Sequence, residues 1–330
     1  MDNLTHSLVG LFLARAGFRR ASPYGTALMV LAANAPDVDV VSGLGGAVTY
    51  IEWHRNITHS LIGWPVVALM SVGLVAAATR TKLPWLKAWL IALVGVGSHL
   101  LLDLTNTYGV RLLLPFSGRW FHWDIAPVID LAIWTILLIG VAAPVLVRLV
   151  GSEIGEKDPD SGKAGWAFTA LLFLFAYDYG RSVLHDRAVE PVASRTWEDG
   201  LTPRRAGAFP SGNPLVWTGV AEMYNAYIVV PVDLRGNFHP SVAETFYKGE
   251  RTPALYAAKG SLPFRKFDEF VQYPLWMSVP SGEVENATKV TLLDLRFGTP
   301  RAIGFAATAT VDAQNRVRDT QFGMGGARPR

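Results

Sequence analysis

The chain has 330 residues, half of them hydrophobic and only 17% charged, and its mean hydropathy of +0.25 favours a membrane protein with a soluble part. The formal net charge of +3, without a long basic run, gives no reason to expect nucleic acid binding. Cysteine is absent, which excludes disulfides and thiolate metal sites, so that any metal must use His, Asp, Glu or backbone oxygen.

Two short apolar segments open the chain, and both are predicted to be helices. Residues 3–19 place leucines at helical spacing behind a capping residue, Asn3 or Thr5. The second helix is predicted over residues 26–33 and should end before Pro36, because proline disfavours helix in the residue that precedes it. A glycine-rich loop is predicted over residues 42–56.

Three later segments are apolar and long enough to cross a bilayer. They cover residues 61–78, 85–104 and 126–150, and a fourth apolar segment at 166–177 is short for a span. The membrane bilayer is therefore the first expected partner of this chain.

The composition changes after Asp178, where prolines, glycines and charges become frequent. Short alternating runs at 227–230, 290–293 and 302–305 are typical of strands. The predicted fold is a mainly α-helical membrane-embedded bundle over residues 1–180, followed by a soluble β-rich domain over 181–330. The sequence does not indicate an oligomeric state.

The strongest candidate site is formed by His99 and Asp103, at the end of the apolar segment 85–104. Residues four apart lie on one face of a helix. An imidazole and a carboxylate so placed can hold one divalent metal, and ionisable groups within a membrane segment usually have a function. A polar pair that only joins two helices is the alternative.

Further candidate ligands fall at the same ends of the predicted spans. If neighbouring helices run antiparallel, one membrane face collects the candidate ligands His6, Asp37, Asp39, His54, His59, His99 and Asp103, together with Asp124. The opposite face collects the basic residues Arg15, Arg19, Arg20, Arg80, Lys82, Lys87 and Arg148. Simpler interpretations remain open: an Asx turn for Asp37 and Asp39, and interfacial positions for His54, His59 and Asp124.

Such ligands suit zinc, and also manganese or iron, and their number allows two or more ions. A site of this kind can activate a water and clamp a phosphoryl group. We therefore expect catalytic roles for Asp124, as ligand or base, and for Arg55, as a cation that holds phosphate oxygens. Thr58, Ser60, Asn106 and Tyr108 are expected to orient the ligands.

Four ordered motifs resemble a known family. They are Met1-Asp2-Asn3-Leu4-Thr5-His6, Ala35-Pro36-Asp37-Val38-Asp39, His54-Arg55-Asn56-Ile57-Thr58-His59-Ser60, and His99-Leu100-Leu101-Leu102-Asp103 with the following Thr105-Asn106-Thr107-Tyr108-Gly109. Together they resemble the YdjM-type, LexA-regulated membrane-bound metal-dependent hydrolases over roughly residues 1–180. The resemblance implies an integral protein of the bacterial inner membrane. More remotely, the His-x-x-x-Asp helix resembles the zinc phospholipase C and P1 nuclease group, although the zinc-binding terminal Trp of that group has no counterpart here.

The function we expect is metal-dependent hydrolysis of phosphoesters, with lipid head groups as one substrate class. The alternatives are a metal-ion transporter and a structural membrane protein that a metal stabilises. Transporter sites tend to lie near the membrane midplane, whereas these residues gather at span ends, which favours hydrolysis. Because short basic loops stay in the cytoplasm, the metal site and the C-terminal domain are predicted to face outward.

Overall fold

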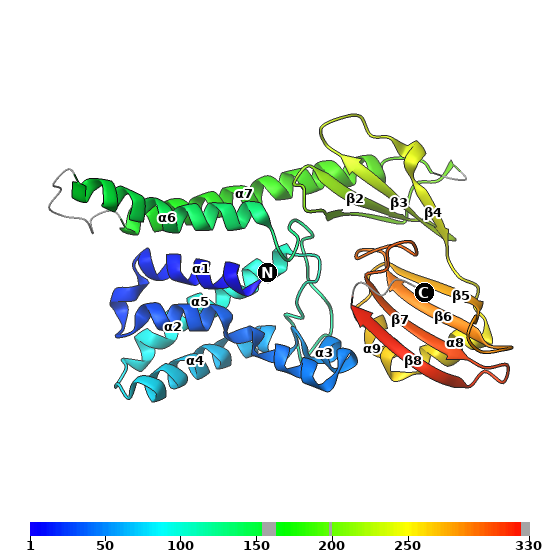
Figure 1. The fold of residues 1–330 in the computed structure, drawn as a ribbon, viewed down its shortest axis with the longest axis horizontal. Coiled ribbons are helices and arrows are strands. Elements are labelled where there is room, and N and C mark those ends of the chain that lie inside the picture. Colours follow the sequence, from blue (N-terminus) through cyan, green and yellow to red (C-terminus); the bar gives the residue numbers. More distant parts are fainter. Residues whose placement is uncertain (154–162, 198–199, 325–330) are drawn as a thin grey trace. The chain divides into compact units, whose positions relative to one another are not determined.

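The computed structural model describes residues 1–153, 163–197 and 200–324. The chain forms two compact units, Met1–Asp39 with Arg55–Val183 and Val40–His54 with Leu184–Arg330. The predicted fold class is confirmed, because the first unit is helical and the second contains two antiparallel sheets (Figure 1). The segment Val40–His54, which the sequence analysis assigned to the membrane domain, is grouped with the second unit.

The first unit is built from long apolar helices joined by short 3-10 segments. The helices are α1 (Asn3–Arg15), α2 (Gly25–Asn34), α4 (Gly63–Thr79), α5 (Trp85–Thr105), α6 (Leu131–Glu153) and α7 (Lys163–Ala193), the last of which continues into the second unit. The 3-10 segments are η1 (Phe18–Ala21), η2 (Ala35–Gly45) and η3 (Ile57–His59).

Helix α2 packs against both α1 and α5, and small residues let the three helices approach closely. A Cβ atom on Gly10 of α1 would lie 2.9 Å from Cβ of Ala33, and one on Gly95 of α5 would lie 2.8 Å from Cβ of Ala32. Any larger residue at either glycine would push α2 away. The two glycines therefore fix the spacing of the helices that carry the candidate site.

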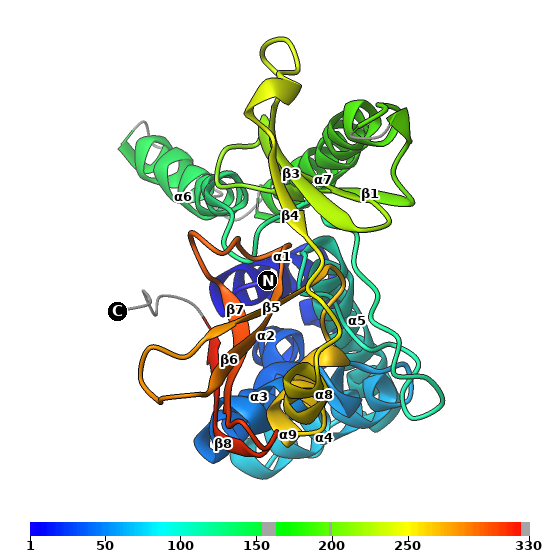
Figure 2. The ribbon, with the colours of Figure 1, turned by 90° about the vertical axis from the view of Figure 1, so that its right-hand side faces the viewer.

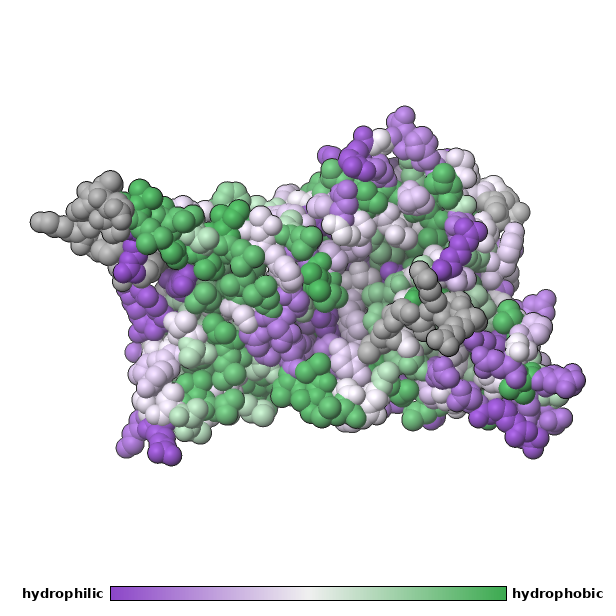
Figure 3. Space-filling model, in the orientation of Figure 1, coloured by the Kyte–Doolittle hydropathy of each residue, from purple (hydrophilic) through white to green (hydrophobic). Residues whose placement is uncertain are grey.

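Three helical segments of the described chain are long and apolar enough to cross a membrane: Gly25–Gly45, Trp85–Thr105 and Leu131–Val150. A fourth is obtained if the bent pair Ala47–His59 and Gly63–Thr79 counts as one span. Large apolar side chains of α6, among them Leu146 and Val150, are exposed and form part of a hydrophobic surface (Figure 3). That surface fits contact with lipid.

One boundary of the first two helices differs from the prediction and one agrees with it. Asp2, rather than Asn3 or Thr5, caps α1, because its carboxylate accepts hydrogen bonds from the backbone N–H groups of Leu4 and Thr5. The predicted end of the second helix is confirmed, because α2 ends at Asn34, before Pro36, and the chain continues as the 3-10 segment η2.

Two segments are more helical than predicted. Residues 42–56 contain the end of η2 and the helix α3 (Ala47–Trp53) instead of a loop. The apolar segment 166–177 is only part of α7, which extends to Ala193 because Ala188 and Val192 continue an apolar stripe that packs on the first sheet. The β-rich part therefore begins later than residue 181.

The second unit contains two four-stranded antiparallel sheets, each in sequential order. The first consists of β1 (Arg205–Pro210), β2 (Val216–Glu222), β3 (Ala226–Asp233) and β4 (Glu244–Tyr247), and the second of β5 (Pro274–Pro280), β6 (Thr288–Asp294), β7 (Phe305–Val311) and β8 (Val317–Met324). The 3-10 turn η5 (Pro240–Val242) precedes β4, and the helices α8 (Pro253–Lys259) and α9 (Leu262–Asp268) lie against the second sheet (Figure 2).

Two of the three predicted strands are confirmed. Residues 227–230 lie in β3 and residues 290–293 lie in β6. The third was placed too early, because β7 begins only at Phe305. A Cβ atom on Gly304 would lie 1.9 Å from the carbonyl oxygen of Phe297. The backbone at Gly304 therefore packs directly against Phe297, and this stretch forms a tight connection. Both sheets contribute to one core, in which Phe209 and Val229 meet Tyr273 and Leu293.

Candidate metal centre

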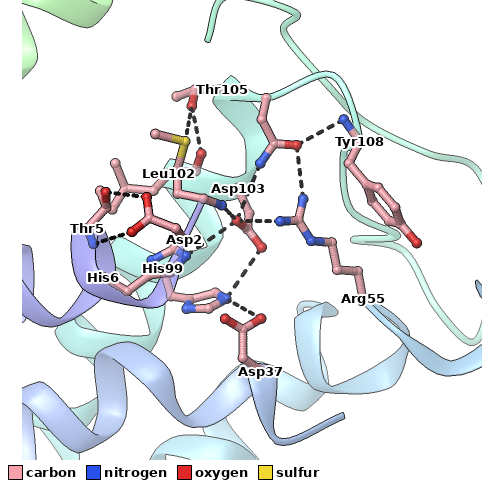
Figure 4. A network of polar contacts seen from close by, with 12 residues as sticks. Asp2, Thr5, His6, Asp37, Arg55, His99, Leu102, Asp103, Thr105 and Tyr108 are labelled. Carbon is pink, nitrogen blue, oxygen red and sulfur yellow. Dashed lines mark hydrogen bonds and ion pairs between the residues drawn. The ribbon is translucent and has the colours of Figure 1, made fainter. Parts of the chain in front are cut away.

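Four side chains of the first unit converge on one buried point. Asp37 comes from η2, His59 from η3, and His99 and Asp103 from α5. One ligand atom of each lies within 4.8 Å of the others. His59, His99 and Asp103 are fully buried and Asp37 is 8% exposed. The structure thus brings together four of the residues that the sequence analysis selected, and Figure 4 shows three of them, Asp37, His99 and Asp103.

The distances between these atoms match the spacing of ligands around a single ion. His59 Nε2 lies 3.1 Å from His99 Nε2. Each of these nitrogens lies 3.5 Å from Asp37 Oδ1 and 3.4 Å from Asp103 Oδ2. Metal–ligand bonds of about 2.0–2.1 Å in a tetrahedron place neighbouring ligand atoms roughly 3.3 Å apart. The four atoms therefore have the spacing of a metal site.

Both imidazoles are held with Nε2 toward this point. The carbonyl oxygen of Ala33 lies 2.8 Å from Nδ1 of His99 and can accept its proton. The carboxylate of Asp39 lies 3.1 Å from Nδ1 of His59 and also accepts a hydrogen bond of 2.7 Å from the Thr58 hydroxyl. Partners of this kind fix the tautomer that leaves Nε2 free to bind a metal.

Asp39 therefore contacts His59 at Nδ1, the ring nitrogen that does not face the other three residues of the cluster. Its Oδ2 also accepts a hydrogen bond of 2.8 Å from the backbone N–H of Arg55. These contacts define an orienting role for one oxygen of Asp39. They do not test the prediction that Asp39 is also a metal ligand.

The second oxygen of Asp103 faces cations instead of the imidazole pair. Arg55 Nη2 donates to Asp103 Oδ1 at 3.0 Å, and the amino group of Met1 contacts the same oxygen (Figure 4). Asn106 holds the guanidinium in place, because its Oδ1 accepts from Arg55 Nη1 at 3.0 Å. The centroid of the Tyr108 ring lies 4.9 Å from the guanidinium carbon of Arg55. Arg55 thus adjoins the cluster, while its catalytic role stays a prediction.

His6 lies directly beside the four. Its ring stacks on His99 with centroids 3.8 Å apart, and its Nε2 lies 3.5 Å from Asp103 Oδ1. Within the described part of the chain, neither ring nitrogen makes a well-directed hydrogen bond. Buried polar atoms are usually satisfied, so this ring is a candidate for an additional metal contact.

The roles predicted for two further residues, His54 and Asp124, stay predictions. His54 belongs to the second unit, where its ring stacks on Tyr50 with centroids 4.5 Å apart. Asp124 pairs with His122, whose Nδ1 lies 2.8 Å from its Oδ2, and adopts a left-handed φ of 57°. The catalytic role of Asp124 remains a prediction.

Sequence reasoning missed the contribution of the backbone. The Ala33 carbonyl that orients His99 has no signature in the sequence, because every residue carries a carbonyl group. A signal existed only indirectly, in the small residues of α2 that permit a close helix crossing.

The apolar helices and the buried His/Asp cluster define an integral membrane protein with a possible metal site. The chain belongs to the YdjM inner membrane protein family, whose sequence model matches residues 1–184. The family predicted from the motifs is thereby confirmed, and this match supports an inner membrane location. The remote link to the zinc phospholipase C and P1 nuclease group stays a prediction.

Two relatives match parts of this chain. The uncharacterized protein YfhP of Bacillus subtilis (strain 168) is 33% identical over 131 residues, which cover 36% of this chain and 39% of YfhP. Inner membrane protein YbcI of Escherichia coli (strain K12) is 32% identical over 136 residues, which cover 39% of this chain and 78% of YbcI. No solved structure matches this chain.

Proposed function

We propose that this protein is a membrane-bound, metal-dependent hydrolase of phosphoesters. The observation that carries the proposal is the set of contacts of 3.1–3.5 Å that joins Asp37, His59, His99 and Asp103. Arg55 and the Met1 amino group offset part of the buried charge at Asp103 Oδ1, and a metal ion facing Asp37 Oδ1 and Asp103 Oδ2 would offset more of it. Zinc suits this donor set best, and manganese or iron would also fit.

The chain also supplies groups that a purely structural site would not need. His6 offers two nitrogens beside the four ligands, and Arg55 places a guanidinium against Asp103. A guanidinium at this position can hold phosphate oxygens by paired hydrogen bonds, which supports phosphoesters over uncharged substrates. When bound, a divalent ion would supply Lewis acidity and make a water more acidic.

A metal that only stabilises the fold is the second candidate. Structural zinc sites are tetrahedral and closed by four protein ligands, and the cluster contains four buried ligands at suitable spacing. Metal content alone cannot separate this candidate from the hydrolase. Turnover by the metal-loaded protein separates them.

The test uses the intact protein, purified in detergent without chelator. Its metal content is measured by mass spectrometry, and turnover is measured on phosphodiesters, phosphomonoesters and phospholipids. We expect at least one zinc, manganese or iron ion per chain and metal-dependent hydrolysis of at least one substrate class. Removal of the metal should abolish turnover, and its return should restore turnover.

Matched histidine and aspartate variants connect activity to the cluster. His99→Ala and Asp103→Asn should lose metal and activity together. His239→Ala should retain both, because His239 is exposed and its side chain caps no helix. A protein that holds the metal but cleaves no substrate would support the structural role, and a protein that binds no metal would refute both candidates. Metal uptake by proteoliposomes would support the transporter alternative.

A further inference from the structure

A groove of about 770 Å³ lies within the second unit, far along the chain from the metal ligands. Its walls come from the turn between β2 and β3, the segment after β4, the helix α8 and the strand β5. The lining combines basic with aromatic side chains: Arg204, Lys248, Arg251 and Lys259 with Tyr224, Tyr227, Tyr256 and Trp276. Its volume is typical of sites for small ligands.

Within the described part of the chain, two of the four cations are neutralised by nearby carboxylates. Lys248 Nζ lies 2.9 Å from Glu222 Oε1, and Lys259 Nζ lies 3.2 Å from Asp268 Oδ2. Burial raises the pKa of Glu222, but the hydrogen bond from Lys248 and the charges of Lys248 and Arg205 outweigh it and hold that pKa below its usual range. Glu222 is therefore ionised.

The other two cations of the groove are Arg204 and Arg251. Within the described residues, neither Arg204 nor Arg251 forms an ion pair. The groove thus carries an excess of positive charge from two guanidinium groups, which are suited to paired hydrogen bonds with phosphate. Its ligand should be an anion.

Aromatic rings give the groove flat surfaces beside these charges. Tyr224 is 81% exposed and Tyr256 is 56% exposed, so their rings are open to a ligand. The Arg204 guanidinium lies 6.0 Å from the Tyr224 ring, and Lys259 lies 5.7 Å from the Trp276 ring. An aromatic face next to a cation can stack on a sugar or base ring while the cation attracts a negatively charged substituent of that ring.

One glycine keeps the walls close together. A Cβ atom on Gly249 would lie 2.5 Å from the carbonyl oxygen of Trp276, so that only glycine allows the segment after β4 to lie against β5. The groove is therefore a feature of the fold and not only of exposed side chains.

We propose that this groove binds a small phosphorylated ligand with a sugar or base ring. The phosphate contacts Arg204 and Arg251, and the ring stacks on Tyr224. The proposal does not rest on the metal centre, because every residue in it belongs to the second unit. It would stand even if the protein had no hydrolase activity.

The test is calorimetric titration of the intact protein with inorganic phosphate, a hexose phosphate and a nucleoside monophosphate, measured at two salt concentrations. We expect at least one ring-bearing phosphate to bind more tightly than inorganic phosphate, and to bind more weakly at high salt. The two ring-bearing probes separate a sugar from a nucleotide ligand.

Variants of exposed residues locate the binding. The double variant Arg204→Gln/Arg251→Gln should weaken binding at least about tenfold, as expected for the loss of charge-assisted hydrogen bonds. The control Arg235→Gln/Arg318→Gln removes two arginines whose side chains are 57% and 56% exposed and pair with Asp233 and Asp312, and it should bind normally. Tyr224→Ala should weaken the ring-bearing probe by about tenfold and leave inorganic phosphate unchanged.

Three results would overturn the proposal. They are no binding of any probe, equal binding by the arginine double variant, and binding of a single-stranded oligonucleotide without binding of the small probes. Circular dichroism of each variant shows that a loss of binding does not come from unfolding.

Discussion

The imidazole of His99 is oriented by the backbone of Ala33, whose carbonyl oxygen lies 2.8 Å from Nδ1. The two residues come from different helices, α5 and α2, so the direction of a candidate metal ligand depends on how closely these helices pack. The two helices approach closely at Gly95, one helical turn before His99, where a Cβ atom would lie 2.8 Å from Cβ of Ala32 and 3.1 Å from the Met29 carbonyl oxygen. Helix spacing and ligand geometry are therefore coupled.

This coupling predicts that Gly95→Val weakens both the fold and metal binding. Valine would force α2 away from α5, at a cost of about 1–3 kcal/mol, and would pull Ala33 away from His99. We expect a lower melting temperature in detergent and weaker zinc binding in a competition assay with a chelating dye. The matched control is Gly73→Val in α4, where a Cβ atom meets nothing within 4 Å. Equal behaviour of the two variants would argue against the coupling.

The contact of Asp39 with His59 predicts an effect on metal affinity without loss of the fold. Asp39→Asn keeps the shape of the side chain but removes the charge that faces Nδ1 of His59. Loss of such a partner weakens metal binding by about 10–100-fold, which the same dye assay would measure.

Asp233→Asn provides the control for that variant, because Asp233 pairs with Arg235 on an exposed part of the second unit. It should leave the metal affinity unchanged. If Asp39→Asn removed the metal as completely as Asp103→Asn, Asp39 would be a ligand and not only an orienting residue.

The sequence predicted those parts of the site that depend on side-chain chemistry and helical spacing. His99 and Asp103 could be placed on one helix face because a helix repeats every 3.6 residues. Asp37 and His59 could be added because each lies next to the end of an apolar segment. These predictions required only that neighbouring spans run antiparallel.

The sequence did not predict the parts that depend on tertiary packing. The extension of α7 to Ala193 depends on a sheet that covers Ala188 and Val192. Glycines near Gly45 suggested a loop, yet η2 and α3 form there, because packing in the folded unit overrides local preference. The hydrogen bond from His99 to Ala33 likewise appears only when two distant segments meet.

Membrane orientation remains the prediction with the most direct test. The connection between α4 and α5 carries Arg80 and Lys82, with Lys87 in the first turn of α5, and no acidic residue. Short basic loops stay in the cytoplasm, so this connection should be cytoplasmic. The loop between α5 and α6, at the metal-site end of α5, should then face outward.

Alkaline phosphatase, which is active only outside the cytoplasm, tests this arrangement when it is fused at three positions. A fusion after Arg80 should be inactive. An insertion after Gly118, where a Cβ atom meets nothing within 4 Å, should be active. A fusion after Arg330 should also be active if α7 crosses the membrane and carries the second unit outward. Phosphatase activity of the Arg80 fusion would contradict the predicted orientation. If the Arg330 fusion alone were inactive, the metal site would still face outward, but the second unit would lie in the cytoplasm.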